Sequence, residues 1–369
     1  MTLAATTARL DQIEEGGREM MLFRYVRTGF VVLALAAFNG PAQSQDKITL
    51  KVLGQPIASG LIQKNKEQPF FENLAEKSGL PISVDYKPID TTGIKDVDQL
   101  RIMKSGLFEM VSLRMSVISR DEPATLGLDL VGAAPDFKSA RQVGDAYLEV
   151  LDRRLQKQFQ VKLLGVWPFG PQVLFCRKPV ERFNDVKGMK VRVFDQIQAR
   201  FFQSLGATAV PMSFPETHQA LSLGVVDCGL TSPASANAAG WPEVTTHVLP
   251  IGLQFGMNGY GIRLATWSKF KPDQQAKLAA MINTLVDDIW KYAEALSADV
   301  SNCNSGKDPC TTGKRYKLTS VAVNSADIEF ARKAMQESSL PNWAEQCDRI
   351  DPECSRNWRK AVGPVVGLK

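Results

Sequence analysis

The chain has 369 residues and 44% of them are hydrophobic, which is enough to fill two ordinary domain cores and excludes a disordered or fibrous protein. The formal net charge of +5 is small for this length, and no run of five or more basic residues occurs. We therefore do not expect nucleic acid as a partner.

The N-terminal segment has the pattern of a secretory signal peptide. Arg24 and Arg27 precede an apolar run over residues 30–38, and small residues follow at Ala42 and Ser44. This order of basic, apolar and small residues predicts export from the cytoplasm, with cleavage after Ala42 or Ser44. A single uncleaved membrane anchor is the alternative, but about nine apolar residues are far fewer than the roughly 20 that span a bilayer.

A first series of strands and helices follows the signal segment. Strand patterns cover residues 47–54, 81–89 and 107–113, and helical patterns cover 67–79, 95–106 and a segment that begins near Ser139 as its cap. This alternation predicts a β/α domain in which parallel pairing of the strands is the default.

A second series begins after two strand-like runs that follow closely within residues 161–179. It contains the strand "MKVRVF", a helix over 195–205 and the strand "TAVPM". The next helix has a capping box at Ser213 and Glu216 and ends at Gly224. Two β/α series in one chain predict two lobes.

The longest helical pattern starts at Pro272 and reaches about Val300. About 29 residues at 1.5 Å each give roughly 44 Å, which exceeds the width of one small domain, so this helix can run across both lobes. A dimer-forming coiled coil is the alternative, but the apolar stripe covers only about two heptads. We expect an α/β, two-lobed fold with a long helix spanning both lobes.

The expected domain limits follow from these patterns. They are a cleaved signal region over 1–44, lobe I over 45–167 plus 250–285, and lobe II over 168–249 plus 286–369, with a disulfide-bearing C-terminal extension.

Six cysteines fit an oxidising compartment. Cys303 and Cys310 enclose one turn-rich segment and Cys347 and Cys354 enclose another, so we predict two local disulfides. A zinc site is the competing interpretation, but neither pair has CxxC spacing and no histidine is near.

The other two cysteines, Cys176 and Cys228, lie in apolar runs. Buried free thiols are the preferred interpretation for them. A third disulfide is the alternative if the two strands are neighbours.

Arg192 lies between two valines in the strand "MKVRVF". Taken alone, it is most simply a solvated residue of an edge strand. Its surroundings change this interpretation, because "VKGMKVRVF", "LGATAVPM" and "ETHQALSLGVVDCG" resemble the core of the extracytoplasmic solute receptors of tripartite ATP-independent periplasmic (TRAP) transporters, the DctP-like family. The resemblance covers about residues 47–300 and does not include the cysteine-rich C-terminal part.

The resemblance implies an α/β, two-lobed fold like that of periplasmic binding proteins, with a ligand cleft between the lobes. It also implies a periplasmic solute-binding protein that captures an organic acid and delivers it to a TRAP-type membrane permease. In the family the strand arginine forms a salt bridge with the carboxylate of the ligand, and Arg192 matches that position. A planar guanidinium suits this role because its paired donors match the two oxygens of a carboxylate.

Other candidate binding residues depart from the family pattern. Gln172 lies where the family commonly has a second arginine, and the hydroxyls of Thr231 or Ser232 replace an amide-bearing contact. Arg114 follows the third strand of the first lobe and is a second candidate for an anion, with a surface loop position as the alternative.

Aromatic and polar candidates complete the expected site. Trp167 and Phe214 are aromatic candidates, for which packing in the core is the alternative, and Ser59 is a polar candidate in the loop after the first strand.

No cofactor, metal or catalytic residue is expected, and we expect a monomer. A secreted α/β hydrolase is the main alternative, but the chain has no GxSxG, HExxH or P-loop motif. A periplasmic carboxylate sensor without a transport role is a further alternative.

Overall fold

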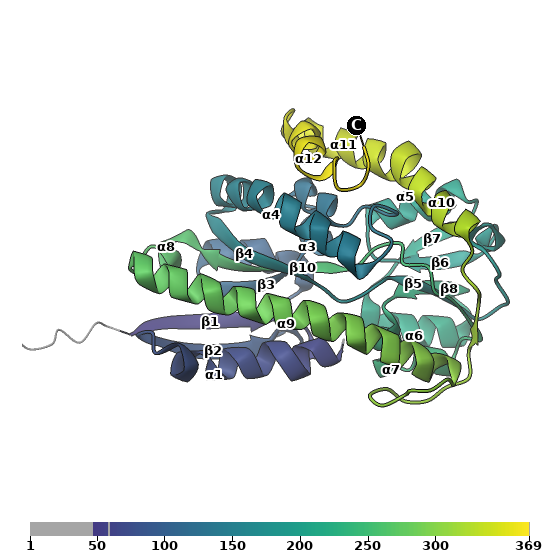
Figure 1. The fold of residues 1–369 in the computed structure, drawn as a ribbon, viewed down its shortest axis with the longest axis horizontal. Helices are drawn as coiled ribbons and strands as arrows, with labels where there is room; N and C mark the ends of the chain where they lie inside the picture. The colour runs from purple at the N-terminus through teal and green to yellow at the C-terminus, as the bar shows by residue number, and fades with distance from the viewer. Residues whose placement is uncertain (1–46, 58–59, 369) are drawn as a thin grey trace, which may run out of the picture. The chain divides into compact units, whose positions relative to one another are not determined.

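The protein is described by a computed structural model that covers residues 47–57 and 60–368. The predicted signal region and its cleavage site lie outside the described residues. Two β-sheets, each covered by helices, build the described part of the chain (Figure 1).

The first sheet has the strand order β2 (Ile82–Pro88), β1 (Ile48–Gly54), β3 (Met110–Arg114), β10 (Met257–Arg263) and β4 (Val161–Pro168). β1 pairs in parallel with β2 and with β3, as the β/α pattern predicts. β10 arrives from a distant part of the chain and lies antiparallel between β3 and β4. The strand pattern alone did not place it there.

Helices cover the first sheet on the outside. They are α1 (Gln68–Ser78), α2 (Gln99–Ser105), α3 (Met115–Ile118), α4 (Phe137–Phe159) and α8 (Leu264–Trp267). α1 packs against β2 and α4 packs against β4. The cap of α4 differs from the expectation, since the Asp136 carboxylate accepts the hydrogen bond from the Ser139 amide and Ser139 itself lies inside the helix.

The second sheet has the order β11 (Thr319–Ser320), β9 (His247–Leu249), β5 (Val173–Cys176), β8 (Cys228–Thr231), β6 (Lys190–Val193) and β7 (Thr208–Pro211). β6 pairs in parallel with β7 and β8, and β5 is antiparallel to β8 and β9. Helices α5 (Gln196–Ser204), α6 (Phe214–Leu223) and α7 (Pro233–Ala238) belong to this part of the fold.

The capped helix of the second series forms as predicted. α6 begins after Ser213, whose capping box with Glu216 is complete, and it ends at Gly224 in the left-handed conformation. α5 is also capped, because the Asp195 carboxylate accepts a hydrogen bond from the Gln198 amide at 2.7 Å.

The chain passes between the sheets at two short segments that lie side by side. Residues 169–172 lead from β4 to β5, and residues 250–256 lead from β9 to β10. The two segments exchange backbone hydrogen bonds, including Gln172 N to Gln254 O at 2.7 Å. Gly256 has a φ of +63°, and a Cβ there would lie 2.9 Å from the side-chain nitrogen Nε2 of Gln172. This close crossing therefore requires glycine.

The long helix α9 covers Pro272–Ser305, five residues beyond the predicted end. It packs against β4 and α4 of the first sheet and against α7 beside the second sheet, so it contacts both lobes as predicted (Figure 1). Its buried stripe includes Leu278, Ile282 and Ile289.

The C-terminal extension forms α10 (Ser325–Ala334), α11 (Leu340–Ile350) and α12 (Cys354–Val362). The extension is predicted to belong to lobe II, and it contacts both parts of the fold: residues Met335–Ser339 pack against α5, whereas α11 packs against the 3₁₀ turn Pro123–Leu128 and α12 packs against α4 (Figure 1). The indole nitrogens of Trp343 and Trp358 donate to Pro123 O at 2.9 Å and to Gly127 O at 2.7 Å. The exact residue limits of the two lobes stay a prediction.

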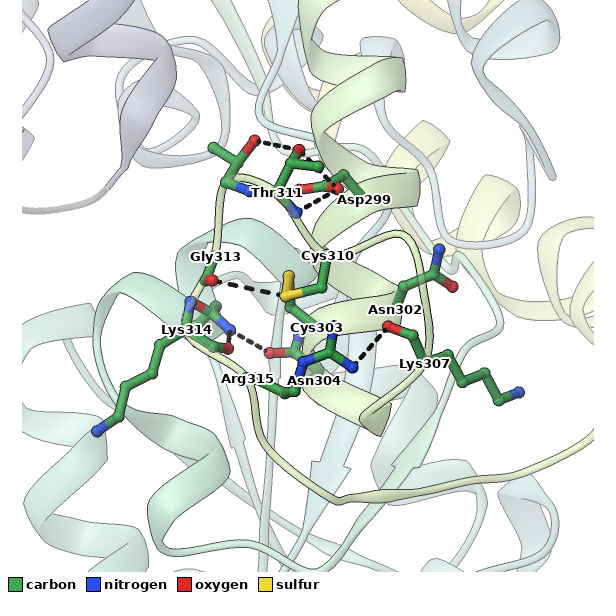
Figure 2. The surroundings of a disulfide bond; sticks show 12 residues. Asp299, Asn302, Cys303, Asn304, Lys307, Cys310, Thr311, Gly313, Lys314 and Arg315 are labelled. Atoms are coloured by element: carbon green, nitrogen blue, oxygen red, sulfur yellow. Dashed lines mark hydrogen bonds between the residues drawn. A yellow bond between two sulfur atoms is a disulfide. The ribbon is translucent and has the colours of Figure 1, made fainter.

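Both predicted local disulfides are present. Cys303 near the end of α9 bonds to Cys310, and Cys347 of α11 bonds to Cys354 at the start of α12. Figure 2 shows the first of these, where the Asp299 carboxylate also accepts hydrogen bonds from the chain just after Cys310, at Thr311 N (2.9 Å).

The preferred interpretation of Cys176 and Cys228 was wrong. β5 and β8 are neighbours in antiparallel register, Cys176 lies opposite Cys228, and the two form a third disulfide with a Cα–Cα distance of 4.1 Å. The prediction that both side chains are buried is confirmed, since both are 0% exposed. The pairing depends on a strand register that links residues 52 positions apart.

Candidate functional site

A cavity of about 850 Å³ is lined by residues of both lobes and of the two short segments, 169–172 and 250–256, that connect the sheets. We call these two segments the crossover. The first lobe contributes residues of the segment 89–97 and of the segment 114–117 after β3. The second lobe contributes Arg192, Phe194, residues 211–216 and Thr231, and the crossover contributes Phe169, Gln172 and Gly256. The predicted cleft between the lobes therefore has walls from both.

Arg192 belongs to the second-lobe wall of the cavity. β6 is an inner strand, and Arg192 is opposite Gly229 of β8 and Val210 of β7. Side chains alternate between the faces of a strand, so Val191 and Val193 enter the core while Arg192 lies on the other face. Only 3% of Arg192 is exposed, which excludes the solvated edge position.

Two backbone carbonyls hold the Arg192 side chain. Its Nε donates to Met212 O at 3.0 Å, and its Nη1 donates to Leu230 O at 2.9 Å. Nη2 donates to no other described residue. The guanidinium is therefore fixed in direction, with donor capacity left at its Nη1 and Nη2 end.

Arg192 forms no ion pair with any carboxylate of the described residues. Asp195 is the acid that favours its charge, but the Asp195 carboxylate is occupied by the Gln198 amide and by the Gln254 side chain at 3.2 Å. Burial, and next the charge of Arg114, lower the pKa of Arg192 to about 9. The guanidinium keeps its charge at neutral pH, but that charge is poorly compensated.

Aromatic rings surround the guanidinium. Its central carbon is 5.6 Å from the ring centre of Phe194 and 5.9 Å from that of Trp241. Phe214 stacks on Trp241 with 5.4 Å between the ring centres. The rings offer partial compensation through cation–π attraction and exclude water from one side.

Arg114 occupies the first-lobe wall and has a different environment. Its Nη1 forms a salt bridge with Asp96 at 3.2 Å, and its guanidinium carbon lies 5.1 Å from the ring centre of Phe169. The charge of Arg114 is therefore already paired within the protein.

Of the eight residues predicted for the site, five line the cavity: Arg192, Arg114, Gln172, Thr231 and Phe214. Trp167 does not line it, because it is fully buried and packs edge-on against Phe169. Ser232 does not line it either, since its hydroxyl caps α7 by accepting from Ser235 N at 3.2 Å. Ser59 lies outside the described residues.

Sequence reasoning missed several residues of this cavity. Phe169 follows Trp167 by two positions. An aromatic residue of this segment does line the cavity, but it is Phe169 and not the predicted Trp167. Phe194 follows Arg192 by two positions and lies on the same side, which strand alternation indicates. Asp96 gave no local signal, because its partner Arg114 is 18 positions away.

Among the described residues, no helix is long and apolar enough to cross a membrane. No group of three or more His, Cys, Asp or Glu side chains there could hold a metal ion.

Comparisons with known proteins agree with this architecture. Residues 54–307 match the family model of bacterial extracellular solute-binding proteins, family 7 (DctP). A solute-binding protein of Roseobacter denitrificans is 25% identical over 258 residues, which is 69% of this chain and 78% of that protein. The C4-dicarboxylate-binding periplasmic protein DctP of Rhodobacter capsulatus is 26% identical over 79% of this chain and 84% of its own.

A solved structure shows the same fold. The crystal structure of a TRAP periplasmic solute-binding protein from Desulfovibrio salexigens with bound orotic acid superposes with a TM-score of 0.75. It is 14% identical in sequence and covers 86% of this chain and all of that one. The chain belongs to bacterial extracellular solute-binding protein family 7, the DctP family of extracytoplasmic TRAP receptors, whose members bind solutes without catalysing a reaction.

Proposed function

We propose that this protein captures an organic acid in the periplasm, holds its carboxylate on Arg192 and delivers it to a TRAP-type membrane permease. The observation that carries the proposal is a buried guanidinium with free donors in the wall of a cavity and with no carboxylate partner among the described residues.

The energetics of Arg192 favour an anionic ligand. A buried charge without a partner costs several kcal/mol, and a carboxylate supplies both the opposite charge and two hydrogen-bond acceptors. The carboxylate fits the Nη1 and Nη2 end of the guanidinium, since Nε already donates to Met212 O. The Thr231 hydroxyl, which lines the cavity next to the carbonyl that Nη1 contacts, is a second proposed contact.

Binding also explains why the cavity has walls from two lobes. Arg192 belongs to one lobe and Arg114 with Asp96 to the other, so a ligand on Arg192 contacts both lobes when they close. A ligand that binds the closed state better shifts the protein toward it. Delivery to a permease rests on the family, whose related members include a C4-dicarboxylate-binding protein and a receptor that holds orotic acid.

Thermal stabilisation of the purified protein by a panel of mono- and dicarboxylates tests the proposal. We expect at least one carboxylate to raise the melting temperature, and we expect Arg192→Gln to weaken its binding about 30-fold or more, because removing one partner of a buried charge pair costs about 2–5 kcal/mol. Arg192→Lys keeps the charge but lacks the paired donors, so its affinity should fall between the two.

Arg356→Gln on α12 is the matched control, because this arginine is exposed and paired with Glu353 away from the cavity. It should bind like the unmodified protein. Full affinity of a folded Arg192→Gln variant, shown by an unchanged circular dichroism spectrum, would refute the anchoring role. Turnover of an ester, amide or glycoside would refute the binding-protein function itself.

A further inference from the structure

The charges and the walls of the cavity point to one class of acid. We propose that the ligand is a monocarboxylate with a sizeable apolar body, aliphatic or aromatic, and not a short dicarboxylate. This inference rests on the proposed function and narrows the substrate class of the same site.

The cavity offers one unpaired buried cation. Arg192 has no ion-pair partner among the described residues, whereas the Arg114 guanidinium is bound to Asp96 at 3.2 Å and covers the ring of Phe169. A second carboxylate on Arg114 would have to displace Asp96 or share the cation with it. Lys95 also lines the cavity, but its side chain is exposed, and a solvated lysine contributes little to an ion pair.

Acidic groups line the same cavity and disfavour a second negative charge. Asp90, Asp96 and Glu216 all belong to its lining, and Asp96 is already paired with Arg114. Once Arg192 holds the first carboxylate, a second carboxylate would lie in a cavity whose lining still carries the charges of Asp90 and Glu216 against that of Lys95, and like charges at short range in a partly desolvated cleft repel.

The remaining wall is mostly apolar. Its members come from both lobes and from the crossover: Pro56, Ile89, Ile94, Val97, Val117, Phe169, Phe194, Pro211, Met212, Phe214, Pro215 and Ala239. Val97 is 38% exposed, although it is a large hydrophobic residue. The free energy of binding to such a surface is most favourable for a ligand whose apolar groups bury it from water.

The size of the cavity also favours a ligand with a sizeable apolar body. About 850 Å³ lies in the upper part of the range of roughly 300–1,000 Å³ that holds drug-sized ligands. A four-carbon diacid would leave most of the apolar wall in water. Each buried methylene of a longer acid adds about 0.8 kcal/mol, which is about a fourfold gain in affinity.

Titration calorimetry with a graded panel tests the inference. The probes are straight-chain monocarboxylates from propanoate to octanoate, phenylacetate and 3-phenylpropanoate, together with malonate and succinate, all at one ionic strength. We expect affinity to rise about fourfold for each added methylene until the cavity is filled, and we expect every diacid to bind more weakly than the apolar monoacid of equal chain length.

The outcomes separate this inference from the proposed function. Arg192-dependent binding of malonate or succinate that is tighter than that of every monoacid would overturn the inference and leave the proposed function intact. Binding of no carboxylate at all would overturn both. A flat response to chain length would also overturn the inference, since it means that the apolar wall stays uncovered.

Asp96→Asn gives a gain-of-binding test. It removes the partner of Arg114, so the ratio of succinate affinity to hexanoate affinity should rise at least fivefold. Asp98→Asn is the matched control two residues away, because Asp98 pairs with the exposed Arg101 and does not line the cavity. An equal shift in both variants, or no shift in either, would show that the Arg114–Asp96 pair does not exclude the second carboxylate.

Discussion

The disulfide between Cys176 and Cys228 should contribute more to stability than either local disulfide. A covalent link lowers the entropy of the unfolded chain by an amount that grows with the loop it closes. The loop here has a sequence separation of 52, which corresponds to about 4 kcal/mol at 25 °C, whereas a separation of 7 corresponds to about 2.4 kcal/mol. The free energy of unfolding of the double variant Cys176→Ala, Cys228→Ala should therefore fall by at least about 4 kcal/mol. Both side chains are also buried, so their truncation adds to the loss.

Guanidinium chloride unfolding of the oxidised protein measures this difference. The control is the double variant Cys303→Ala, Cys310→Ala, which removes the disulfide that closes the short loop at the end of α9. Thiol titration of the unfolded, unreduced protein should find no free thiol. Two free thiols, or a loss no larger than that of the control, would refute the reasoning from the β5–β8 register.

Three further predictions concern pH and helix capping. Burial raises the pKa of Glu67 to about 8, so its contribution to stability is fully present below about pH 4.5 and is lost as pH rises through 8; Glu67→Gln should flatten the melting temperature between pH 5 and 9, and parallel profiles would contradict this. Because burial lowers the pKa of Arg192 only to about 9, the guanidinium stays charged between pH 6 and 8, so carboxylate affinity measured by calorimetry should be constant over this range, and an affinity that falls steadily from pH 6 to 8 would contradict the charged anchor. Ser213→Ala removes half of a capping box with Glu216 and should cost about 1 kcal/mol in chemical denaturation, and no measurable cost would mean that the box does not stabilise α6.

Local signals predicted the elements that depend on neighbouring residues. The capping box and Gly224 mark both ends of α6, and the apolar stripe from Pro272 indicates α9 over nearly its whole length. The two short disulfides were predictable for the same reason, because the six turn-rich residues between the cysteines of each pair can bring the two thiols together. Such features require no knowledge of the rest of the fold.

Contacts between distant segments were not predictable in this way. The antiparallel insertion of β10, the packing of α12 on α4 and the Cys176–Cys228 bond each depend on the register or docking of segments tens of residues apart. The alternation of apolar residues along a strand indicates which face is buried, but it does not identify the neighbouring strand.

The candidate site divides along the same line. The sequence by itself determined that Arg192 lies on the opposite face from two buried valines in a strand of the second β/α series, and its surroundings indicated the family and the role of a carboxylate anchor. Only the tertiary structure decided that Arg114 is paired with Asp96 and that apolar residues from both lobes line the same cavity. The physical reason is that charge compensation and desolvation are properties of groups that meet in space, and the chain order of those groups does not encode their distance.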